Sequence, residues 1–453
     1  MQENKRGSFS GKLGYVMATA GSAVGLGNIW RFPYLAAKYG GGAFLLVYIL
    51  LALTFGYAMI MSETAIGRMT GKSPVGAFAS LNRSRLMRAG GWLNAIIPML
   101  IVPYYSVIGG WVCRYLWGYL SGQGQSMALE GNFEGFLGSP AATLIFFLIF
   151  AACTMAVIFG GVRNGIENVS RVMMPMLVVL ALVVVGFSVT RPGALAGVKY
   201  FLIPDLKHFS LMTVVSALGQ MFYSLSIAMG ILITFGSYTG RDVDIEGTTA
   251  QVEIFDTVIA VMAGLMVIPA VFAFSGGDSA ALGKGPSLMF ITLPKVFESM
   301  GGPWIGTLFF LLVLMAALTS SVSLAETAVS TFEDEMHLSR PKATAIVSVI
   351  IFALGSLSCL GFNVLSGVAP LGMDILSFFD FMTNSVMMPI AAVATILLVL
   401  RSIGLQRLEA EITQSSKFRR RAVYRFVVKY LAIALLVVIL ISSLCDAFGL
   451  IHI

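Results

Sequence analysis

Charged residues are scarce in this chain of 453 residues, because only 11% are Asp, Glu, Lys or Arg while 57% are hydrophobic. A soluble domain carries about a quarter charged residues, so the composition excludes an ordinary water-soluble protein. Uncharged stretches such as 39–62 and 135–162 exceed the ~20 apolar residues that cross a ~30 Å hydrocarbon core. We therefore expect an all-α membrane protein with many spans.

Histidine and cysteine are also rare, with three His and four Cys in the whole chain. His208, His337 and His452 fall in expected loops or at the C-terminal end, and the cysteines lie in or beside apolar stretches without CxxC spacing. These positions offer no His/Cys metal cluster, no disulfide framework and no buried base for intramembrane hydrolysis. The sequence therefore does not predict an enzyme.

Charges and Gly/Pro clusters divide the chain into eleven expected helical spans, since a segment in lipid must satisfy its own backbone hydrogen bonds. The first span is too long and too rich in glycine for a signal peptide. The expected limits are 13–38, 41–68, 90–121, 140–159, 166–190, 212–238, 248–275, 303–333, 341–361, 374–402 and 423–447.

Cations are distributed unevenly between the two sides. With the N terminus inside, 21 of the 29 Lys and Arg fall on the inner side, in segments 1–12, 68–88, 163–171, 340–342 and 401–429 and at Arg241. Because Lys and Arg are retained in cytoplasmic loops, we expect a cell-membrane protein with a cytoplasmic N terminus and an external C terminus. The net charge of +7 then indicates contact with anionic lipid rather than nucleic acid, and nothing indicates an obligatory protein partner.

The first and sixth spans each contain a helix-breaking segment near the membrane midplane, judged by a rise of ~1.5 Å per residue. Residues 20–28 (AGSAVGLGN) hold three glycines, which disfavour a helix interior, and residues 224–230 (SLSIAMG) form a second candidate break. Irregular backbone at that depth must be buried or line a hydrated cavity. Two breaks five spans apart predict an inverted repeat with a substrate site between the halves. The alternative is that the glycines only allow close helix packing.

The expected organisation is an N-terminal latch at 1–12, a first repeat at 13–190, a second repeat at 212–402 and a last helix at 423–447. The connection 276–303 is long, external and apolar, so we expect it to fold back over the mouth of the protein as a lid. The alternative is a plain surface loop.

Several motifs resemble those of one family, the neurotransmitter:sodium symporters. They are GSAVGLGNIWRFPY (21–34), GGGAF (40–44), GQMFYSLS (219–226), FITLP (290–294) and LTSSVS (318–323), and they extend over nearly the whole chain. The resemblance implies the fold of the bacterial leucine transporter and Na⁺-driven symport of an amino acid by alternating access.

The resemblance also implies two sodium sites. The first is formed by the carbonyl of Ala23, the side chains of Asn28, Ser224 and Asp256, and the substrate carboxylate. The second is formed by the carbonyls of Gly21, Val24 and Ala316 and the hydroxyls of Thr319 and Ser320.

Asp256 distinguishes this chain within the resemblance. It lies roughly 15 Å into its span, where an unpaired carboxylate costs at least ~2.5 kcal/mol, so a cation is expected beside it. Family members often have Asn at this position and bind chloride, whereas Ala260, one turn on, has no hydroxyl to hold chloride. We therefore expect chloride independence. The alternative is a solvated acid low in an inner vestibule.

For the substrate, freed N–H groups at 23–27, with Gly25 and Gly27, and the phenol of Tyr105 are expected to hold the α-carboxylate. Carbonyls of the second break are expected to accept the ammonium group. The pocket walls carried over from the family are Ile101, Phe222, Tyr223, Ser226, Met229, Ser320 and Leu324. Because they are largely apolar, we expect a neutral, hydrophobic or aromatic L-amino acid, unless this stripe is ordinary helix packing.

The resemblance further implies an outer gate. Arg31 and Asp380 are expected to pair above the site, with Asp374 as the alternative acid. The aromatic layer beneath them would consist of Tyr104, Tyr105 and either Phe222 or Tyr223.

An inner gate is implied by Arg6 and Phe9, with Asp334 as acid partner and Tyr238 nearby. The alternative for Asp334 is a solvated helix end. Gly165 and Pro175 match a pattern linked to unwinding of the fifth span, since proline lacks the N–H that a helix needs; the alternative is a simple kink.

Together these features predict symport of Na⁺ with a neutral L-amino acid, in which each ligand favours binding of the other. The alternative is a facilitator or sensor of the same fold without tight sodium coupling.

Overall fold

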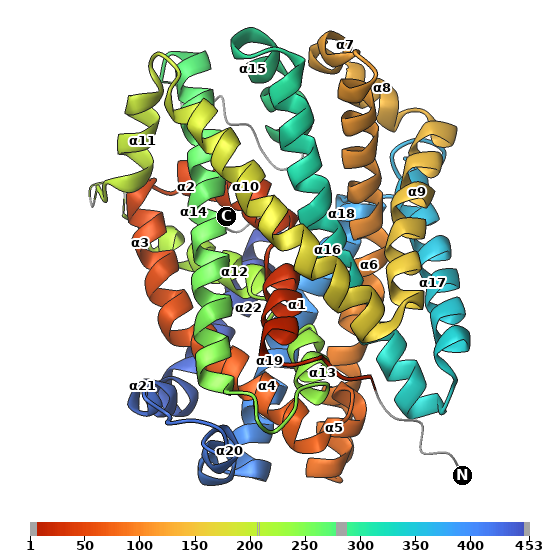
Figure 1. The fold of residues 1–453 in the computed structure, drawn as a ribbon, viewed down its shortest axis with the longest axis vertical. Coiled ribbons are helices and arrows are strands. Elements are labelled where there is room, and N and C mark those ends of the chain that lie inside the picture. The colour runs from red at the N-terminus through yellow and green to blue at the C-terminus, as the bar shows by residue number, and fades with distance from the viewer. Residues whose placement is uncertain (1–6, 206, 208, 278–287, 448–453) are drawn as a thin grey trace.

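The computed structural model describes residues 7–205, 207, 209–277 and 288–447, which fold into a bundle of helices (Figure 1). Nine helices of this described part are long and apolar enough to cross a membrane. Two further spans, the first and the sixth, are interrupted. All eleven predicted spans are therefore present.

The eleven spans follow one another along the chain with short connecting helices between them, and η marks π-helical and 3-10 segments. The spans are α1 (Lys12–Ala23), η1 (Gly27–Arg31) and α2 (Phe32–Lys38); α3 (Gly42–Leu51), η2 (Ala52–Gly56) and α4 (Tyr57–Thr70); α6 (Arg85–Leu120); α9 (Pro140–Phe159); η3 (Val162–Glu167) and α10 (Asn168–Val189); α12 (Leu211–Ser224) and α13 (Ile231–Ser237); α14 (Ile245–Ser275); α16 (Pro303–Met336); α17 (Arg340–Leu360); α18 (Ile375–Asp380), η8 (Phe381–Met387), α19 (Met388–Leu397) and η9 (Leu398–Ile403); and α21 (Arg421–Phe426), η10 (Val427–Leu431) and α22 (Ala432–Ala447). The connecting helices are α5 (Pro74–Leu81), α7 (Gly124–Ala128), α8 (Asn132–Leu137), α11 (Ala194–Leu202), η6 (Leu288–Thr292), α15 (Leu293–Met300), η7 (Pro370–Gly372) and α20 (Leu405–Ile412).

The boundaries follow local sequence signals. The third span differs from its predicted start, because Ser84 caps α6 by accepting a hydrogen bond from Met87 N at 3.3 Å and the helix begins at Arg85. The limits of the two repeats and of the N-terminal latch stay predictions.

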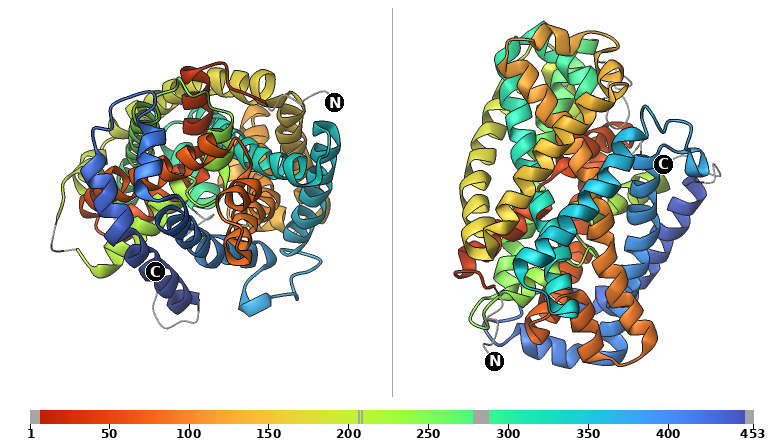
Figure 2. Two further views of the ribbon diagram at one scale, coloured as in Figure 1. Left: turned by 90° about the horizontal axis from the view of Figure 1, so that it is seen from below. Right: turned by 90° about the vertical axis from the view of Figure 1, so that its right-hand side faces the viewer.

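The broken spans lie inside the bundle. α1 packs against α10, α14 and α16, and α13 packs against α4. Seen from below, the helices form a rounded outline, and from the side the molecule is elongated along the helices (Figure 2). The interrupted segments are therefore surrounded by protein, as irregular backbone at membrane depth requires.

Both breaks are real interruptions of the helix. α1 ends at Ala23 and Val24 is extended, with φ −81° and ψ 102°, before helix resumes at Gly27. In the sixth span, Ser226 and Ala228 have positive φ of 55° and 59° although neither is glycine. Such residues cost about 1–3 kcal/mol each and persist at functional sites where surrounding structure holds them. Close packing of glycines alone does not explain these breaks.

The apolar connection 276–303 is not a plain surface loop in its described part. Leu288–Thr292 and α15 bury their apolar side chains, including Leu288 and Val296. Tyr115 of α6 donates a hydrogen bond to the carbonyl of Phe290 at 2.7 Å. Residues 278–287 lie outside the described residues, so the lid stays a prediction.

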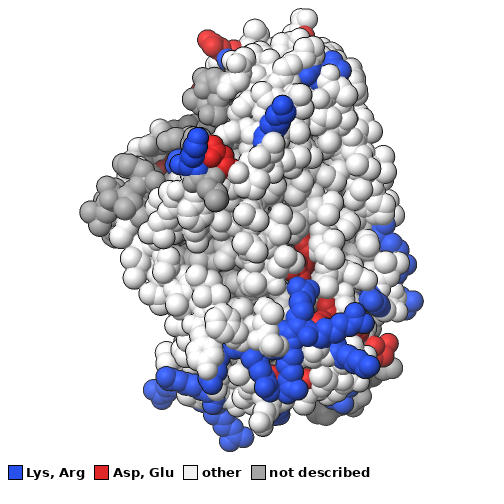
Figure 3. Space-filling view, turned by 90° about the vertical axis from the view of Figure 1, so that its left-hand side faces the viewer, with Lys and Arg blue, Asp and Glu red and all other residues white. Residues whose placement is uncertain are grey.

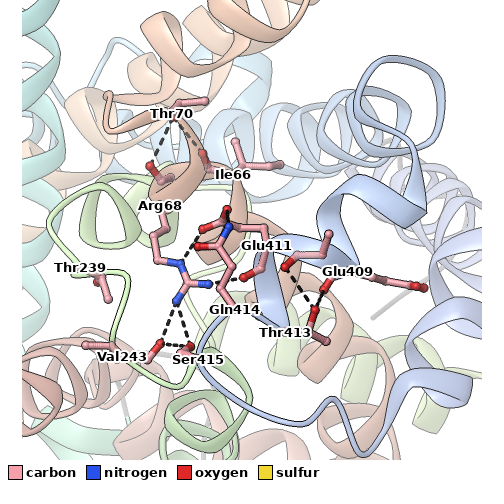
Figure 4. A network of polar contacts seen from close by, with 12 residues as sticks. Ile66, Arg68, Thr70, Thr239, Val243, Glu409, Glu411, Thr413, Gln414 and Ser415 are labelled. Atoms are coloured by element: carbon pink, nitrogen blue, oxygen red, sulfur yellow. Dashed lines mark hydrogen bonds and ion pairs between the residues drawn. The ribbon is translucent and has the colours of Figure 1, made fainter.

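A buried arginine joins α4, α20 and the loop before α14, and α4 and α20 lie toward the lower end of Figure 1. Arg68 at the end of α4 donates Nε to Glu411 Oε1 of α20 at 2.7 Å and Nη1 to the carbonyl of Val243 at 2.7 Å (Figure 4). A second guanidinium nitrogen donates to the carbonyl of Glu411. The side chain of Arg68 is only 1% exposed. This network fixes α20 and the loop before α14 onto α4.

Replacing Arg68 with alanine should lower the thermal stability of the purified protein. Glu411, 9% exposed in its side chain, would be left buried without its cation, and breaking a buried ion pair costs about 3–5 kcal/mol. Thermal unfolding in detergent measures the effect. Arg407→Ala is the control, because Arg407 is exposed on α20, the helix that carries Glu411. Equal unfolding temperatures for the two variants would contradict the role of Arg68.

Candidate functional site

A small cavity of about 30 Å³ lies between the two breaks, which is space for about two water molecules. Segments of α1, η1, α6, α12, α13 and α16 contribute to it. Its lining residues are Ser22, Ala23, Gly25, Leu26, Gly27, Asn28, Ile101, Tyr105, Tyr223, Ser224, Ser226, Met229, Ile231, Ser320 and Leu324. The two breaks therefore meet at one small cavity, lined by residues of both.

The predicted substrate residues line this cavity with one exception. Phe222 is not among the lining residues and its ring lies 6.3 Å from that of Phe55, whereas Tyr223 lines the cavity. Tyr223 and the next residue, Ser224, face the cavity, whereas Phe222 faces the side of α12 that packs against Phe55. Ser22 and Ile231 were not predicted.

Asp256 of α14 is fully buried beside the first break. Its Oδ1 accepts hydrogen bonds from Asn28 Nδ2 at 2.8 Å and Ser224 Oγ at 2.7 Å, and its Oδ2 accepts one from Tyr48 OH at 2.7 Å. All three donors are neutral, and within the described chain Asp256 forms no ion pair. Its negative charge therefore remains available to a cation.

Tyr48 of α3 was missed by sequence reasoning. It is a buried aromatic residue in an apolar span, where ring packing is the ordinary expectation, and no spacing relates it to Asp256. Its hydroxyl nevertheless orients the carboxylate, since it binds the oxygen that Asn28 and Ser224 leave free. The four side chains bring η1, α3, α12 and α14 to one point.

The end of α1 meets α16 where the second sodium site was predicted. Ser320 Oγ lies 3.3 Å from the carbonyl oxygen of Gly21 and 3.1 Å from that of Val24. Thr319 Oγ1 donates to the carbonyl of Ala316 at 3.1 Å, and a Cβ on Gly21 would lie 3.2 Å from Thr319 Cβ. The five residues thus gather carbonyl and hydroxyl oxygens, which are the hard donors that a small cation prefers.

Polar contacts hold the first break in its unwound form. Tyr105 OH accepts a hydrogen bond from Leu26 N at 3.1 Å, and Gln220 Nε2 donates to the carbonyl of Gly27 at 2.9 Å. Gly25 N donates to Asn28 Oδ1 at 3.2 Å, so side chains satisfy the N–H groups of Gly25 and Leu26, and binding of a carboxylate by this wall stays a prediction.

Glu63 of α4 stabilises the second break and was also missed. Its Oε1 accepts a hydrogen bond from Ala228 N at 2.9 Å, while Oε2 is buried without a partner in the described chain. The hydroxyls of Ser22 and Ser226 lie 3.0 Å apart and link this break to the first. A carboxylate in the position of Glu63 was not distinguishable by sequence from an ordinary helix-end acid.

The outer gate residues do not form the predicted pair. Asp380 accepts hydrogen bonds from Tyr104 OH at 3.1 Å and Asn384 Nδ2 at 2.5 Å. Arg31 instead places its guanidinium 5.5 Å from the ring centre of Tyr223, and within the described chain it has no ion pair with Asp380. The outer-gate pair of Arg31 and Asp380 therefore stays a prediction.

The alternative acid for the outer gate has another function. Asp374 caps α18 by accepting hydrogen bonds from Ser377 N at 3.0 Å and Ser377 Oγ at 2.6 Å. A capping carboxylate of this kind is bound to its own helix, so Asp380 is the better candidate.

The inner gate is described only in part, because Arg6 lies outside the described residues. The ring of Phe9 is buried edge-to-face against Tyr15, Phe235 and Tyr238. Asp334 accepts a hydrogen bond from Ser73 N at 2.7 Å.

Tyr238 was predicted at this gate, whereas its partners Glu326 and Arg340 were not. Tyr238 OH donates to Glu326 Oε1 at 2.8 Å, and Arg340 Nη2 pairs with Glu326 Oε2 at 2.5 Å. Glu326 is fully buried, so the cluster ties the end of α13 to α16 and α17. Its members are distant in sequence, which explains why no motif revealed it.

The fifth span is continuous in this structure. It begins with the π-helical segment η3, in which a Cβ on Gly165 would lie 2.1 Å from the carbonyl oxygen of Val157. Pro175 lies inside α10 without ending it. The predicted unwinding at Gly165 and Pro175 therefore stays a prediction.

Comparison with known proteins adds to this geometry. The model of the sodium:neurotransmitter symporter family matches residues 6–132 and 125–450. The chain belongs to this family. It is 36% identical over 423 residues to the uncharacterized sodium-dependent transporter YhdH of Bacillus subtilis (strain 168), covering 92% of each chain. It is also 25% identical to the sodium- and chloride-dependent GABA transporter 2 of Homo sapiens, covering 84% of this chain and 70% of the relative.

Among solved structures, the chain is similar to the crystal structure of MhsT in complex with L-phenylalanine. The TM-score is 0.87 at 34% identity, with 97% of this chain and 100% of that chain covered. The protein is thus a sodium-dependent transporter with the leucine-transporter fold, an inverted five-helix repeat with broken helices 1 and 6. The predicted family and fold class are confirmed.

Proposed function

We propose that this transporter imports a neutral, hydrophobic or aromatic L-amino acid together with Na⁺, at two sodium sites and without chloride. The observation that carries the proposal is the carboxylate of Asp256, which is buried beside the cavity with three neutral donors. A buried charge is stable only with a compensating charge nearby. Na⁺ held between Asp256, Asn28, Ser224 and the substrate carboxylate would supply it.

Sharing one cation between the substrate carboxylate and Asp256 couples the two ligands. Each ligand then increases the affinity for the other by the same factor, so the amino acid binds weakly until Na⁺ arrives. The second site, at Gly21, Val24, Ala316, Thr319 and Ser320, joins α1 to α16, so that a second Na⁺ there would hold α1 in place.

The substrate class is supported by the cavity wall. Within the described chain no charged side chain lines the cavity. Ile101, Met229 and Leu324 supply apolar surface and Tyr223 an aromatic ring, which favours a hydrophobic side chain. Methionine adapts to several shapes. The similar protein MhsT was solved with L-phenylalanine.

Chloride independence is supported by the charge that Asp256 supplies. The human relative is named sodium- and chloride-dependent, whereas in this chain a carboxylate lies at the first sodium site and Ala260, one turn further along α14, has no hydroxyl. A second anion beside Asp256 would be repelled.

The membrane orientation is supported by the distribution of cations. On the face of Figure 3, Lys and Arg gather toward the lower end, where α20 and α21 lie in Figure 1. Because Lys and Arg in short loops are retained on the cytoplasmic side, this end of the molecule faces the cytoplasm. We therefore place the N terminus in the cytoplasm and, after eleven spans, the C terminus outside.

Uptake into proteoliposomes tests the function. Replacing external Na⁺ by K⁺ should lower uptake of L-phenylalanine by about 5- to 150-fold, the usual range of a coupling factor, whereas replacing Cl⁻ by gluconate should leave it unchanged. Competition by the twenty L-amino acids then defines the substrate. Undiminished uptake in K⁺ would indicate a facilitator, and loss in gluconate would contradict chloride independence.

A further inference from the structure

The last membrane span begins with a regular stripe of exposed cations and rings. Arg421, Arg425 and Lys429 follow at intervals of four residues on α21 and η10 and are all exposed. Phe426 and Tyr430, also four apart, are 59% and 63% exposed. Because residues four apart share one face of a helix, the three cations and two rings form one strip, which we call the cation strip.

The arginines of the cation strip are held in place by one acid. Glu409 of α20, 2% exposed in its side chain, pairs with Arg421 Nη2 at 2.5 Å and with Arg425 Nε at 2.5 Å. One carboxylate cannot neutralise two guanidinium groups and the ammonium of Lys429, so the strip keeps a positive charge. The Lys429 ammonium lies 5.0 Å from the ring centre of Tyr430.

The neighbouring Arg420 is less exposed than the arginines of the cation strip, at 31% against 51% for Arg421 and 46% for Arg425. Its guanidinium pairs with Glu253 Oε2 at 2.9 Å and lies 3.8 Å from the ring centre of Tyr57. Arg420 thus binds α21 to α14 and α4. The cation strip begins one residue further and keeps its remaining donors exposed, toward the lower end of the molecule where Figure 3 shows basic side chains gathered.

The position of the cation strip indicates what its ligand is. It precedes the apolar helix α22 and extends roughly 12 Å along the axis at ~1.5 Å per residue, which is longer than the polar layer of one leaflet, about 5–7.5 Å, so its end at Lys429 and Tyr430 reaches the edge of the hydrocarbon core. Exposed aromatic residues are typical of this layer, and Leu53 of the adjacent η2, 41% exposed, adds apolar surface. A soluble acidic partner could not cover these rings and Leu53, because they lie at the depth of the lipid. The charge of the strip and its depth together therefore favour an anionic lipid.

We propose that the cation strip binds the phosphate of an anionic phospholipid. The guanidinium groups of Arg421 and Arg425, oriented by Glu409, present paired N–H donors that match phosphate oxygens. Lys429 extends its ammonium toward the same headgroup while its stem lies along apolar surface. Phe426 and Tyr430 contact the glycerol and acyl chains.

Binding of phosphatidylglycerol to the purified transporter tests this site. In Arg421→Gln/Lys429→Gln, Arg425 stays paired with Glu409, so the acid is not left uncompensated. We expect this double variant to bind phosphatidylglycerol about 10- to 30-fold more weakly, from the usual contribution of two cations at a membrane surface. The matched control is Arg85→Gln/Arg88→Gln, which removes two exposed cations at the start of α6 and should bind like the wild type.

The site is supported if phosphatidylethanolamine of the same acyl chains competes poorly and inorganic phosphate does not compete at equal phosphate concentration. Equal lipid affinity of wild type and double variant would overturn it, as would an equal loss in the control variant. Full competition by inorganic phosphate would show a free-anion site and overturn the lipid assignment. Should the double variant fail to fold, Lys429→Gln alone should weaken binding about fivefold, and an unchanged affinity of that variant would overturn the site as well.

Discussion

Replacing Asp256 with alanine should abolish Na⁺-dependent binding of the amino acid. The carboxylate is the charged ligand of the proposed first sodium site, and removing one partner of a buried charge pair costs about 3–5 kcal/mol, or roughly 100-fold or more in Na⁺ affinity. The measurement is the Na⁺ concentration that gives half-maximal binding of labelled L-phenylalanine to purified protein. Asp256→Asn keeps the size of the side chain but not its charge and should lose affinity in the same way.

A matched control separates this effect from damage to the fold. Asp374→Asn changes the same residue type at the start of α18, where asparagine caps a helix as well as aspartate does, and it should keep the Na⁺ dependence of the wild type. If Asp256→Asn bound Na⁺ normally, the charge at residue 256 would not be a sodium ligand, and the assignment of the first site would be wrong.

The helices could be predicted well from the sequence because lipid allows few choices. Each span must satisfy its own hydrogen bonds, so hydrophobic length and charge placement sufficed to locate all eleven spans. The breaks were also predictable, since the glycines around Gly25 disfavour helix. Their exact backbone was not: the positive φ of Ser226 and Ala228 is held by contacts with other spans, such as the bond from Ala228 N to Glu63.

The residues that sequence reasoning missed are those whose role depends on long-range contacts. Tyr48 and Glu63 have no motif that distinguishes them from packing residues or helix-end acids, and each acquires its role from a partner in a distant span. The choice between Phe222 and Tyr223 depended on helix rotation, which the sequence did not define.

The outer gate shows the same limit. The position of Asp380 was predicted, but its hydrogen bonds with Tyr104 and Asn384 emerge only from the packing of α6 against η8. A motif can identify the residues of a gate, whereas their partners depend on the arrangement of the helices.

Replacing Gly25 with alanine should weaken amino acid binding through sterics rather than charge. A Cβ at this position would lie 2.6 Å from Ser320 Oγ and 3.0 Å from Tyr105 OH. Ser320 belongs to the proposed second sodium site and Tyr105 to the carboxylate wall, so both must move. Overpacking of this kind costs about 1–3 kcal/mol, which corresponds to a loss of about 5- to 150-fold in affinity for L-phenylalanine at saturating Na⁺.

Gly219→Ala is the control for the effect of a glycine-to-alanine change in a broken span. Gly219 lies in α12, and a Cβ there would have no neighbour within 4 Å. Alanine favours helix over glycine by about 1 kcal/mol, so this variant should bind the amino acid normally and unfold at the same or a higher temperature. Normal binding by a folded Gly25→Ala protein would mean that the substrate does not occupy the cavity between the two breaks, because its carboxylate wall cannot accept both a methyl group and a ligand at the same point.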